Sequence, residues 1–173
     1  GFDLAPFRPD IQQADARQLP MDSGVADFAF VDPPYATHLQ YSGDADCIGE
    51  LDVTSGYYEA MSEVIAEVDR VLKPGSYMAL YVSDSYKKRR FEPIGFELFA
   101  RLRQRFTPVD MVSVVRNNKK LKRSNWHAAA AEGNYFLRGF NFLFILQKPA
   151  KSPQEPPPKP VNRARKRKRK LRP

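Results

Sequence analysis

The sequence predicts an α/β fold with a mostly parallel sheet that an antiparallel strand closes. Short apolar runs rich in β-branched and aromatic residues are typical of buried strands, and they occur at 28–31, 76–82, 109–115 and 140–146. A helical pattern lies between the first two runs, as expected for a crossover that joins parallel strands. No crossover helix is evident between the last two runs, which favours an antiparallel pair at the edge of the sheet.

Two helices follow from the spacing of apolar residues. The first is predicted over 57–72, with Tyr57, Met61, Val64, Ile65, Val68, Val71 and Leu72 on one face, and it is expected to stop at Lys73-Pro74-Gly75. The second is predicted to open at Pro93, with Ile94, Leu98, Phe99, Leu102 and Phe106 facing inward. The chain therefore has enough amphipathic structure to cover a sheet.

The segment Asp32-Pro33-Pro34-Tyr35 follows the first strand directly. Each proline fixes its own φ and forces the preceding residue into an extended conformation, which makes this segment a stiff ledge at the carboxyl end of a strand. Open α/β sheets bind ligands at that end. The Asp32 carboxylate and the Pro33 carbonyl could accept hydrogen bonds from both hydrogens of an exocyclic base amine. The Tyr35 ring could stack on the base. A rigid strand-end turn without chemistry is the alternative.

This segment resembles the catalytic motif of the amino-group DNA methyltransferases, which act on adenine N6 or cytosine N4 with S-adenosylmethionine (SAM) as cofactor. The resemblance covers residues 1–149 and implies a Rossmann-like methyltransferase fold. It implies catalytic roles for Asp32, Pro33, Pro34 and Tyr35. It favours adenine N6 as the target, because the cytosine N4 enzymes more often carry Ser in place of Asp32.

The same resemblance implies two cofactor-binding positions upstream of the ledge. Asp3, followed by Leu4, matches the strand end whose acidic residue binds the ribose hydroxyls of SAM. Asp15 and Ala16 match the next strand, where an Asp accepts the adenine amine and its neighbour donates to a ring nitrogen. Without the resemblance, Asp3 would be an exposed acid near the terminus and Asp15 an ordinary turn former.

Positive charge is concentrated at the carboxyl end of the chain. Residues 151–173 hold ten Lys/Arg and one acid, which leaves 18 basic and 19 acidic residues in 1–150, so the whole-chain charge of +8 belongs to a tail. We therefore expect a catalytic domain over 1–149 and a Pro-rich linker with a basic disordered tail over 150–173. Such a tail would bind any polyanion without sequence preference, and it could also be a nuclear address.

A second basic stretch separates the last two strands, within residues 116–139. Its candidate nucleic-acid-binding residues are Lys119, Lys120, Lys122, Arg123 and Trp126. Basic side chains could contact phosphates while the Trp stacks on a base. A solvated loop whose Trp packs on the domain is the alternative.

The first strand of the fold and its glycine-rich turn, which the resemblance requires ahead of Asp3, are absent from these residues. We therefore expect either a longer protein or a partner chain that supplies this SAM-binding loop, and we expect residues 1–173 alone to be inactive. RNA methylation at guanine N2 and a nonenzymatic nucleic-acid-binding subunit stay open as alternatives.

The remaining composition bounds the setting of the protein. A single cysteine, Cys47, excludes an internal disulfide framework and offers no metal cluster, so no metal site is expected. No apolar run approaches the length of a membrane span. We expect no membrane partner and a cytoplasmic location, with the protein bound to the nucleoid in a bacterium or in the nucleus of a eukaryote.

Overall fold

A computed structural model describes residues 1–36, 47–87, 90–116, 126–136 and 139–150. The elements in chain order are β1 (Phe2–Asp3), β2 (Gln12–Gln13), β3 (Ala26–Val31), η2 (Ile48–Glu50), α1 (Tyr57–Val71), β4 (Leu72–Val82), β5 (Ser85–Lys87), β6 (Arg90–Glu92), α2 (Ile94–Leu102), β7 (Thr107–Val115), α3 (Trp126–Gly133) and β8 (Phe140–Gln147). The predicted strands and both predicted helices are thus present, with ends shifted by a few residues.

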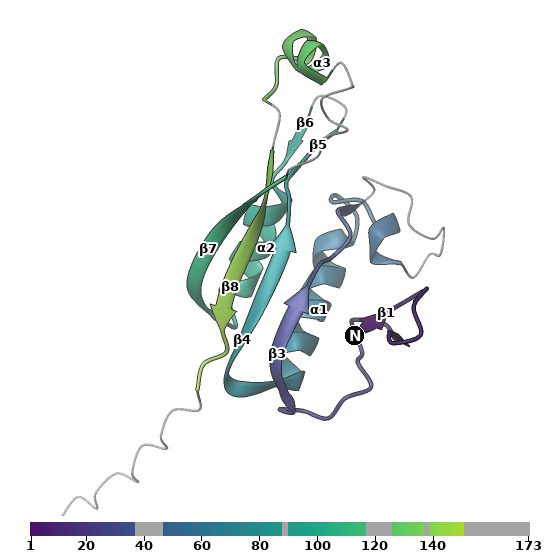
Figure 1. The fold of residues 1–173 in the computed structure, drawn as a ribbon, viewed down its shortest axis with the longest axis vertical. Helices are drawn as coiled ribbons and strands as arrows, with labels where there is room; N and C mark the ends of the chain where they lie inside the picture. The colour runs from purple at the N-terminus through teal and green to yellow at the C-terminus, as the bar shows by residue number, and fades with distance from the viewer. Residues whose placement is uncertain (37–46, 88–89, 117–125, 137–138, 151–173) are drawn as a thin grey trace, which may run out of the picture.

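The main sheet has four strands in the order β3-β4-β8-β7. β3 and β4 are parallel and are joined through α1, whereas β4–β8 and β8–β7 are antiparallel. The predicted crossover and the predicted antiparallel closing pair are both confirmed. A separate two-stranded parallel sheet, β1–β2, lies beyond β3 (Figure 1).

One face of the main sheet carries the hydrophobic core. α1 and α2 both lie on this face (Figure 1), and they pack on side chains that alternate along β4 and β8. Met78, Leu80 and Val82 of β4 are at most 1% exposed. Because β3 and β4 are parallel, both end at the same edge of the sheet, and Asp32, directly after β3, lies at that edge.

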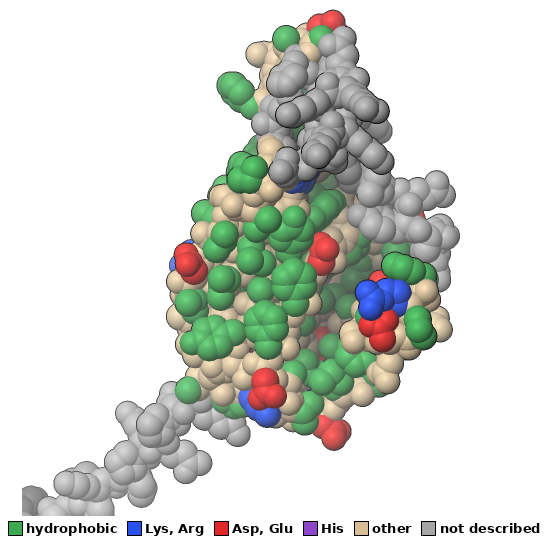
Figure 2. Space-filling model, viewed as in Figure 1, with side chains coloured by type: hydrophobic (Ala, Val, Ile, Leu, Met, Phe, Trp, Pro, Cys, Tyr) green, Lys and Arg blue, Asp and Glu red, His purple; other side chains and the backbone are tan. Residues whose placement is uncertain are grey.

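The opposite face of the main sheet is open among the described residues. Figure 2 shows hydrophobic side chains gathered over this face. Phe28 and Phe30 of β3 are 55% and 58% exposed, and Tyr77 of β4, which pairs with Phe28, is 43% exposed. Large apolar patches of this kind usually mark an interaction surface.

The structure differs from the sequence predictions at three places. Lys73-Pro74-Gly75 does not separate helix from strand, because β4 begins at Leu72 and Gly75 hydrogen-bonds to Lys148 beside β8. The β5–β6 hairpin and α3 were not predicted. Both lie outside the helix-covered core, where short elements leave little hydrophobic periodicity in the sequence.

Candidate active site

The Asp32–Tyr35 ledge lies where β3 ends, and one cavity of about 800 Å³ adjoins it. β1, β3 and α1 bound this cavity. Its lining includes every residue that the sequence analysis assigned to catalysis or cofactor binding: Asp3, Leu4, Asp15, Ala16, Asp32, Pro33, Pro34 and Tyr35. Residues from three separate strand ends therefore share one concave site of the size that small-molecule ligands occupy.

The backbone of the ledge is fixed from below by α1. The Tyr57 hydroxyl at the start of α1 donates a 2.7 Å hydrogen bond to the Pro34 carbonyl, and the Tyr57 side chain is fully buried. The two prolines restrict the backbone conformation of the ledge. The hydrogen bond to Tyr57 then fixes the position of the ledge relative to α1. Sequence reasoning had assigned Tyr57 only to the helix core, because nothing local connects it with a residue 23 positions away.

The ionisable group of the ledge is partly withdrawn from water. Burial raises the pKa of Asp32 above the usual value of an aspartate, because desolvation penalises the charged form. The Asp32 side chain is still exposed on one side, so its lone pairs are available for a ligand that donates hydrogen bonds. This environment suits an acceptor for a base amine.

The Tyr35 ring is held at its hydroxyl end. Asn141 at the start of β8 donates a 3.0 Å hydrogen bond to the Tyr35 hydroxyl, and Arg116 donates to the side-chain oxygen of Asn141. Asn141 is 4% exposed. Sequence reasoning missed Asn141, since an isolated asparagine in an apolar strand gives no functional signal.

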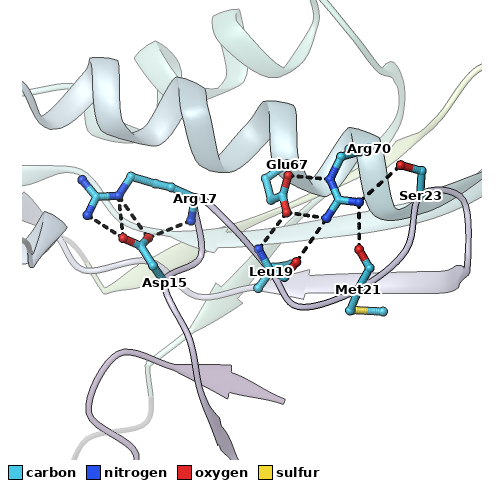
Figure 3. A network of polar contacts seen from close by, with 7 residues as sticks. All are labelled: Asp15, Arg17, Leu19, Met21, Ser23, Glu67 and Arg70. Atoms are coloured by element: carbon cyan, nitrogen blue, oxygen red, sulfur yellow. Dashed lines mark hydrogen bonds and ion pairs between the residues drawn. The ribbon is translucent and has the colours of Figure 1, made fainter.

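The two candidate cofactor carboxylates are held by local bonds. Asp3 accepts a 2.8 Å hydrogen bond from the Ala5 amide. Asp15 forms a 2.6 Å ion pair with Arg17, which Figure 3 shows reaching back over the same turn. Hydrogen bonds from Arg17 lower the pKa of Asp15, although partial burial opposes this effect. Asp15 is therefore ionised at the site but is already engaged by a cation.

A second polar cluster attaches the segment between β2 and β3 to α1 (Figure 3). Glu67 accepts a 2.7 Å hydrogen bond from the Leu19 amide and forms a 2.6 Å ion pair with Arg70. Arg70 also donates to the carbonyls of Leu19 and Met21. The hydrogen bond from Arg70 is the main cause of a lowered pKa at Glu67. This cluster holds the segment that carries Asp15 against the same helix that supports the ledge.

The predicted nucleic-acid-binding residues are not placed in this site. Lys119, Lys120, Lys122 and Arg123 lie outside the described residues, as does the basic tail over 151–173. Trp126 begins α3, but its side chain is not described. These assignments stay predictions.

A family model described as DNA methylase, covering N6 and N4 methyltransferases, matches residues 26–172. The chain belongs to this family. The predicted resemblance is thereby confirmed, while the choice between the N6 and N4 amines is not made by the match. A search of curated proteins found no match.

Solved structures share the fold at low sequence identity. A putative DNA modification methylase from Thermus thermophilus superposes with a TM-score of 0.55 at 18% identity, over 82% of this chain and 54% of that one. The same protein has been solved in complex with SAM. The cytosine-N4-specific PvuII DNA methyltransferase gives a TM-score of 0.58 at 16% identity, over 78% of this chain and 47% of that one.

These likenesses confirm the predicted Rossmann-like methyltransferase fold. The chain spans about half the length of the methylase structures that it matches. Within the described residues no helix is long and apolar enough to cross a membrane.

Proposed function

We propose that this chain carries the base-binding ledge and part of the cofactor site of a SAM-dependent methyltransferase that modifies adenine N6 in DNA. The observation that carries the proposal is the single cavity that joins the Asp32–Tyr35 ledge to Asp3 and Asp15. Family membership supports amino-group methylation, and Asp at position 32 favours adenine over cytosine. RNA methylation at guanine N2 is the second candidate, since the ledge chemistry suits any exocyclic amine.

In this proposal the ledge holds the target base after the base is flipped out of the DNA duplex. Asp32 and the Pro33 carbonyl accept one hydrogen bond each from the two amine hydrogens, while the Tyr35 ring stacks on the target base. Only ionised Asp32 accepts a hydrogen bond with both oxygens, so activity should rise with pH through its raised pKa. Most of the rate would come from positioning the amine.

The cofactor would occupy the part of the cavity near β1 and β2, and its role is to supply the methyl group. Asp3, with Leu4 beside it, would bind the ribose hydroxyls, and Asp15 with the Ala16 amide would bind the adenine of SAM. Arg17 makes four hydrogen bonds to the two carboxylate oxygens of Asp15, so the Arg17 side chain would have to turn away before Asp15 could accept from the adenine amine.

We propose that a segment outside residues 1–173 completes the cofactor site, either in the same polypeptide or in a partner chain. Three features support this. β3 is at the end of the main sheet with an unpaired outer edge among the described residues, and β1–β2 forms a separate sheet on the other side of the cavity. The open apolar face of the main sheet begins at the same strand. Parallel strands are normally covered on both faces.

The basic residues would bring the enzyme to its polymer. Lys119, Lys120, Lys122, Arg123 and Trp126 would contact the nucleic acid, and the tail over 150–173 would bind phosphates through counterion release. The same proposal includes a cytoplasmic location on the nucleoid if the source is a bacterium, and a nuclear location if it is a eukaryote.

The test is transfer of labelled methyl groups to DNA and RNA oligonucleotides, followed by mass spectrometry of the nucleosides. Residues 1–173 alone should give no product, whereas the completed protein should give N6-methyladenine in DNA. Replacing Asp32 with Ala in the completed protein should lower turnover about a hundredfold or more. SAM binding measured by calorimetry, with Asp15→Ala as control, separates a defective cofactor site from a defective ledge.

Each other product has a definite meaning. N4-methylcytosine or N2-methylguanosine would replace adenine as the target and leave the site assignment intact. Turnover by residues 1–173 alone would refute the incomplete site. A completed protein that binds DNA without any methyl product would indicate a nonenzymatic subunit.

A further inference from the structure

The position of Asn141 follows from the direction of the strands. β3 and β4 end at the ledge, and antiparallel β8 therefore starts there, as Figure 1 shows. Asn141 is the residue before Phe142, which pairs with the last residue of β4. β7 runs antiparallel to β8, so its last residue, Val115, and the following Arg116 return to the same end. Asn141 and Arg116 thus lie at the end of the sheet that carries the ledge, where Asn141 contacts Tyr35 and Arg116 contacts Asn141.

The orientation of the Asn141 amide is determined by Arg116. A guanidinium can only donate hydrogen bonds, so the oxygen of Asn141 must face Arg116. The amide nitrogen must then face Tyr35, whose hydroxyl oxygen acts as the acceptor in this contact. Without such a partner the two ends of an Asn amide are hard to distinguish, and either could face the ring.

We infer that Asn141 and Arg116 are positioning residues that fix the Tyr35 ring for stacking on the target base. This role rests on the proposed function, in which Tyr35 is the stacking ring. The hydroxyl lies on the Cβ–Cγ axis of the ring, so a bond at the hydroxyl fixes the direction of that axis. The Tyr57–Pro34 bond fixes the backbone at the other end. A ring whose axis is held at both ends has less conformational entropy to lose when the base arrives.

Asn141 is suited to this role in a way that an apolar residue is not. It is 4% exposed in a strand whose neighbours Phe140 and Phe142 are aromatic, and a buried amide is costly unless it is hydrogen-bonded. Both ends of its amide are bonded, one to Arg116 and one to Tyr35. The strand therefore carries a polar group at the one place where it can contact the ledge.

The direct test is nuclear magnetic resonance of protein labelled with ¹³C at the hydroxyl-bearing carbon of tyrosine. The chain has eight tyrosines, and Tyr35→Phe identifies the Tyr35 signal by its loss. Asn141→Leu, which removes the donor, should shift that signal and leave the other tyrosine signals in place. Asn141→Asp, which replaces the donor with an acceptor, should shift it in the opposite direction. Arg116→Met should broaden or split it, because the amide can then turn over.

An unmoved Tyr35 signal in a folded Asn141→Leu protein would overturn the assignment. Unchanged signals from the other tyrosines report that the variant is folded. If Asn141→Leu does not fold, Arg116→Met gives the same test from an exposed position, and an unmoved signal there would equally overturn the role of Arg116.

A second measurement connects the ring to the base without methyl transfer. An oligonucleotide that contains 2-aminopurine loses fluorescence when an aromatic ring stacks on the probe, so its titration reports the affinity of the stacked state. Asn141→Leu and Arg116→Met should weaken this binding by about three- to tenfold, the value expected for loss of one hydrogen bond. A shifted Tyr35 signal with unchanged probe binding would overturn the positioning role. If Tyr35→Ala also leaves probe binding unchanged, the proposed function fails instead, and the resonance result still stands.

Discussion

The two faces of the main sheet are built from the same strands but meet very different surroundings. On the helix-covered face, Leu80 is 1% exposed and packs under α1 and α2. On the open face, Phe30 is 58% exposed although it is larger and more apolar than many core residues. Successive residues of a strand point to opposite faces of the sheet. Because these strands carry apolar residues at successive positions, both faces of the sheet are apolar. What separates them is whether another element covers them.

This difference shows which half of the fold residues 1–173 can stabilise. The covered face, the ledge and the Glu67 cluster all connect to α1. No described helix covers the open face, and no described strand pairs with the outer edge of β3. The stability of residues 1–173 should therefore depend strongly on the covered face, the ledge and the Glu67 cluster. Association with a completing segment should depend on the open face and the outer edge of β3.

The largest expected effect comes from a change on the covered face. Leu80→Ala should lower the free energy of unfolding by about 3 kcal/mol, because it removes a fully buried side chain and leaves a cavity. Phe30→Ala is the matched control on the open face and should cost about 1 kcal/mol or less, although more atoms are removed. Urea unfolding followed by circular dichroism measures both. Equal losses would mean that the open face is packed in solution.

An intermediate effect is expected at the cluster that attaches residues 19–23 to α1. Glu67→Gln keeps the shape of the side chain but removes the ion pair with Arg70, and it should lower the free energy of unfolding by about 2 kcal/mol at neutral pH. Glu63→Gln, at an exposed position of the same helix, is the control and should change little.

The same variant has a characteristic pH dependence. Folding lowers the pKa of Glu67 below its ordinary value of 4.5. The stabilising contribution of Glu67 is therefore complete above pH 4.5 and is lost as the pH falls through the lower pKa of the folded state. The difference between wild type and Glu67→Gln should therefore shrink in denaturation curves recorded from about pH 7 down to about pH 3. A difference that stays constant over this range would show that the carboxylate charge is not what stabilises the cluster.

The smallest effect on stability, and the most informative for the open face, is expected from Phe28→Lys. The side chain is 55% exposed, so the free energy of unfolding should change by about 0.5 kcal/mol or less. We expect the exposed apolar patch to cause self-association of residues 1–173. Sedimentation velocity should show less of it in Phe28→Lys, because a charge interrupts the patch. Phe7→Lys, at a residue that is 95% exposed in the segment between β1 and β2, should leave association unchanged. The same response from both variants would show that the patch is not the contact surface.

The sequence alone determined the order of the main elements and the nature of the ledge. Apolar periodicity locates α1, α2 and the strands of the main sheet, because each must bury one face. The two prolines after β3 determine the stiffness of the Asp32–Tyr35 ledge without help from the rest of the chain. The family resemblance then placed Asp3 and Asp15 in one site, and the cavity that they line with Asp32 supports that placement.

Only the tertiary structure decided which side chains support the ledge and which face is covered. Tyr57, Asn141 and Arg116 act through hydrogen bonds that span as many as 106 positions, and no local pattern encodes such pairs. Asp15 and Arg17 are only two positions apart, yet the lowered pKa of Asp15 depends on side-chain geometry that their spacing in the sequence does not specify. Alternation makes both faces of the sheet apolar, and only the packing of α1 and α2 shows which of them is the core.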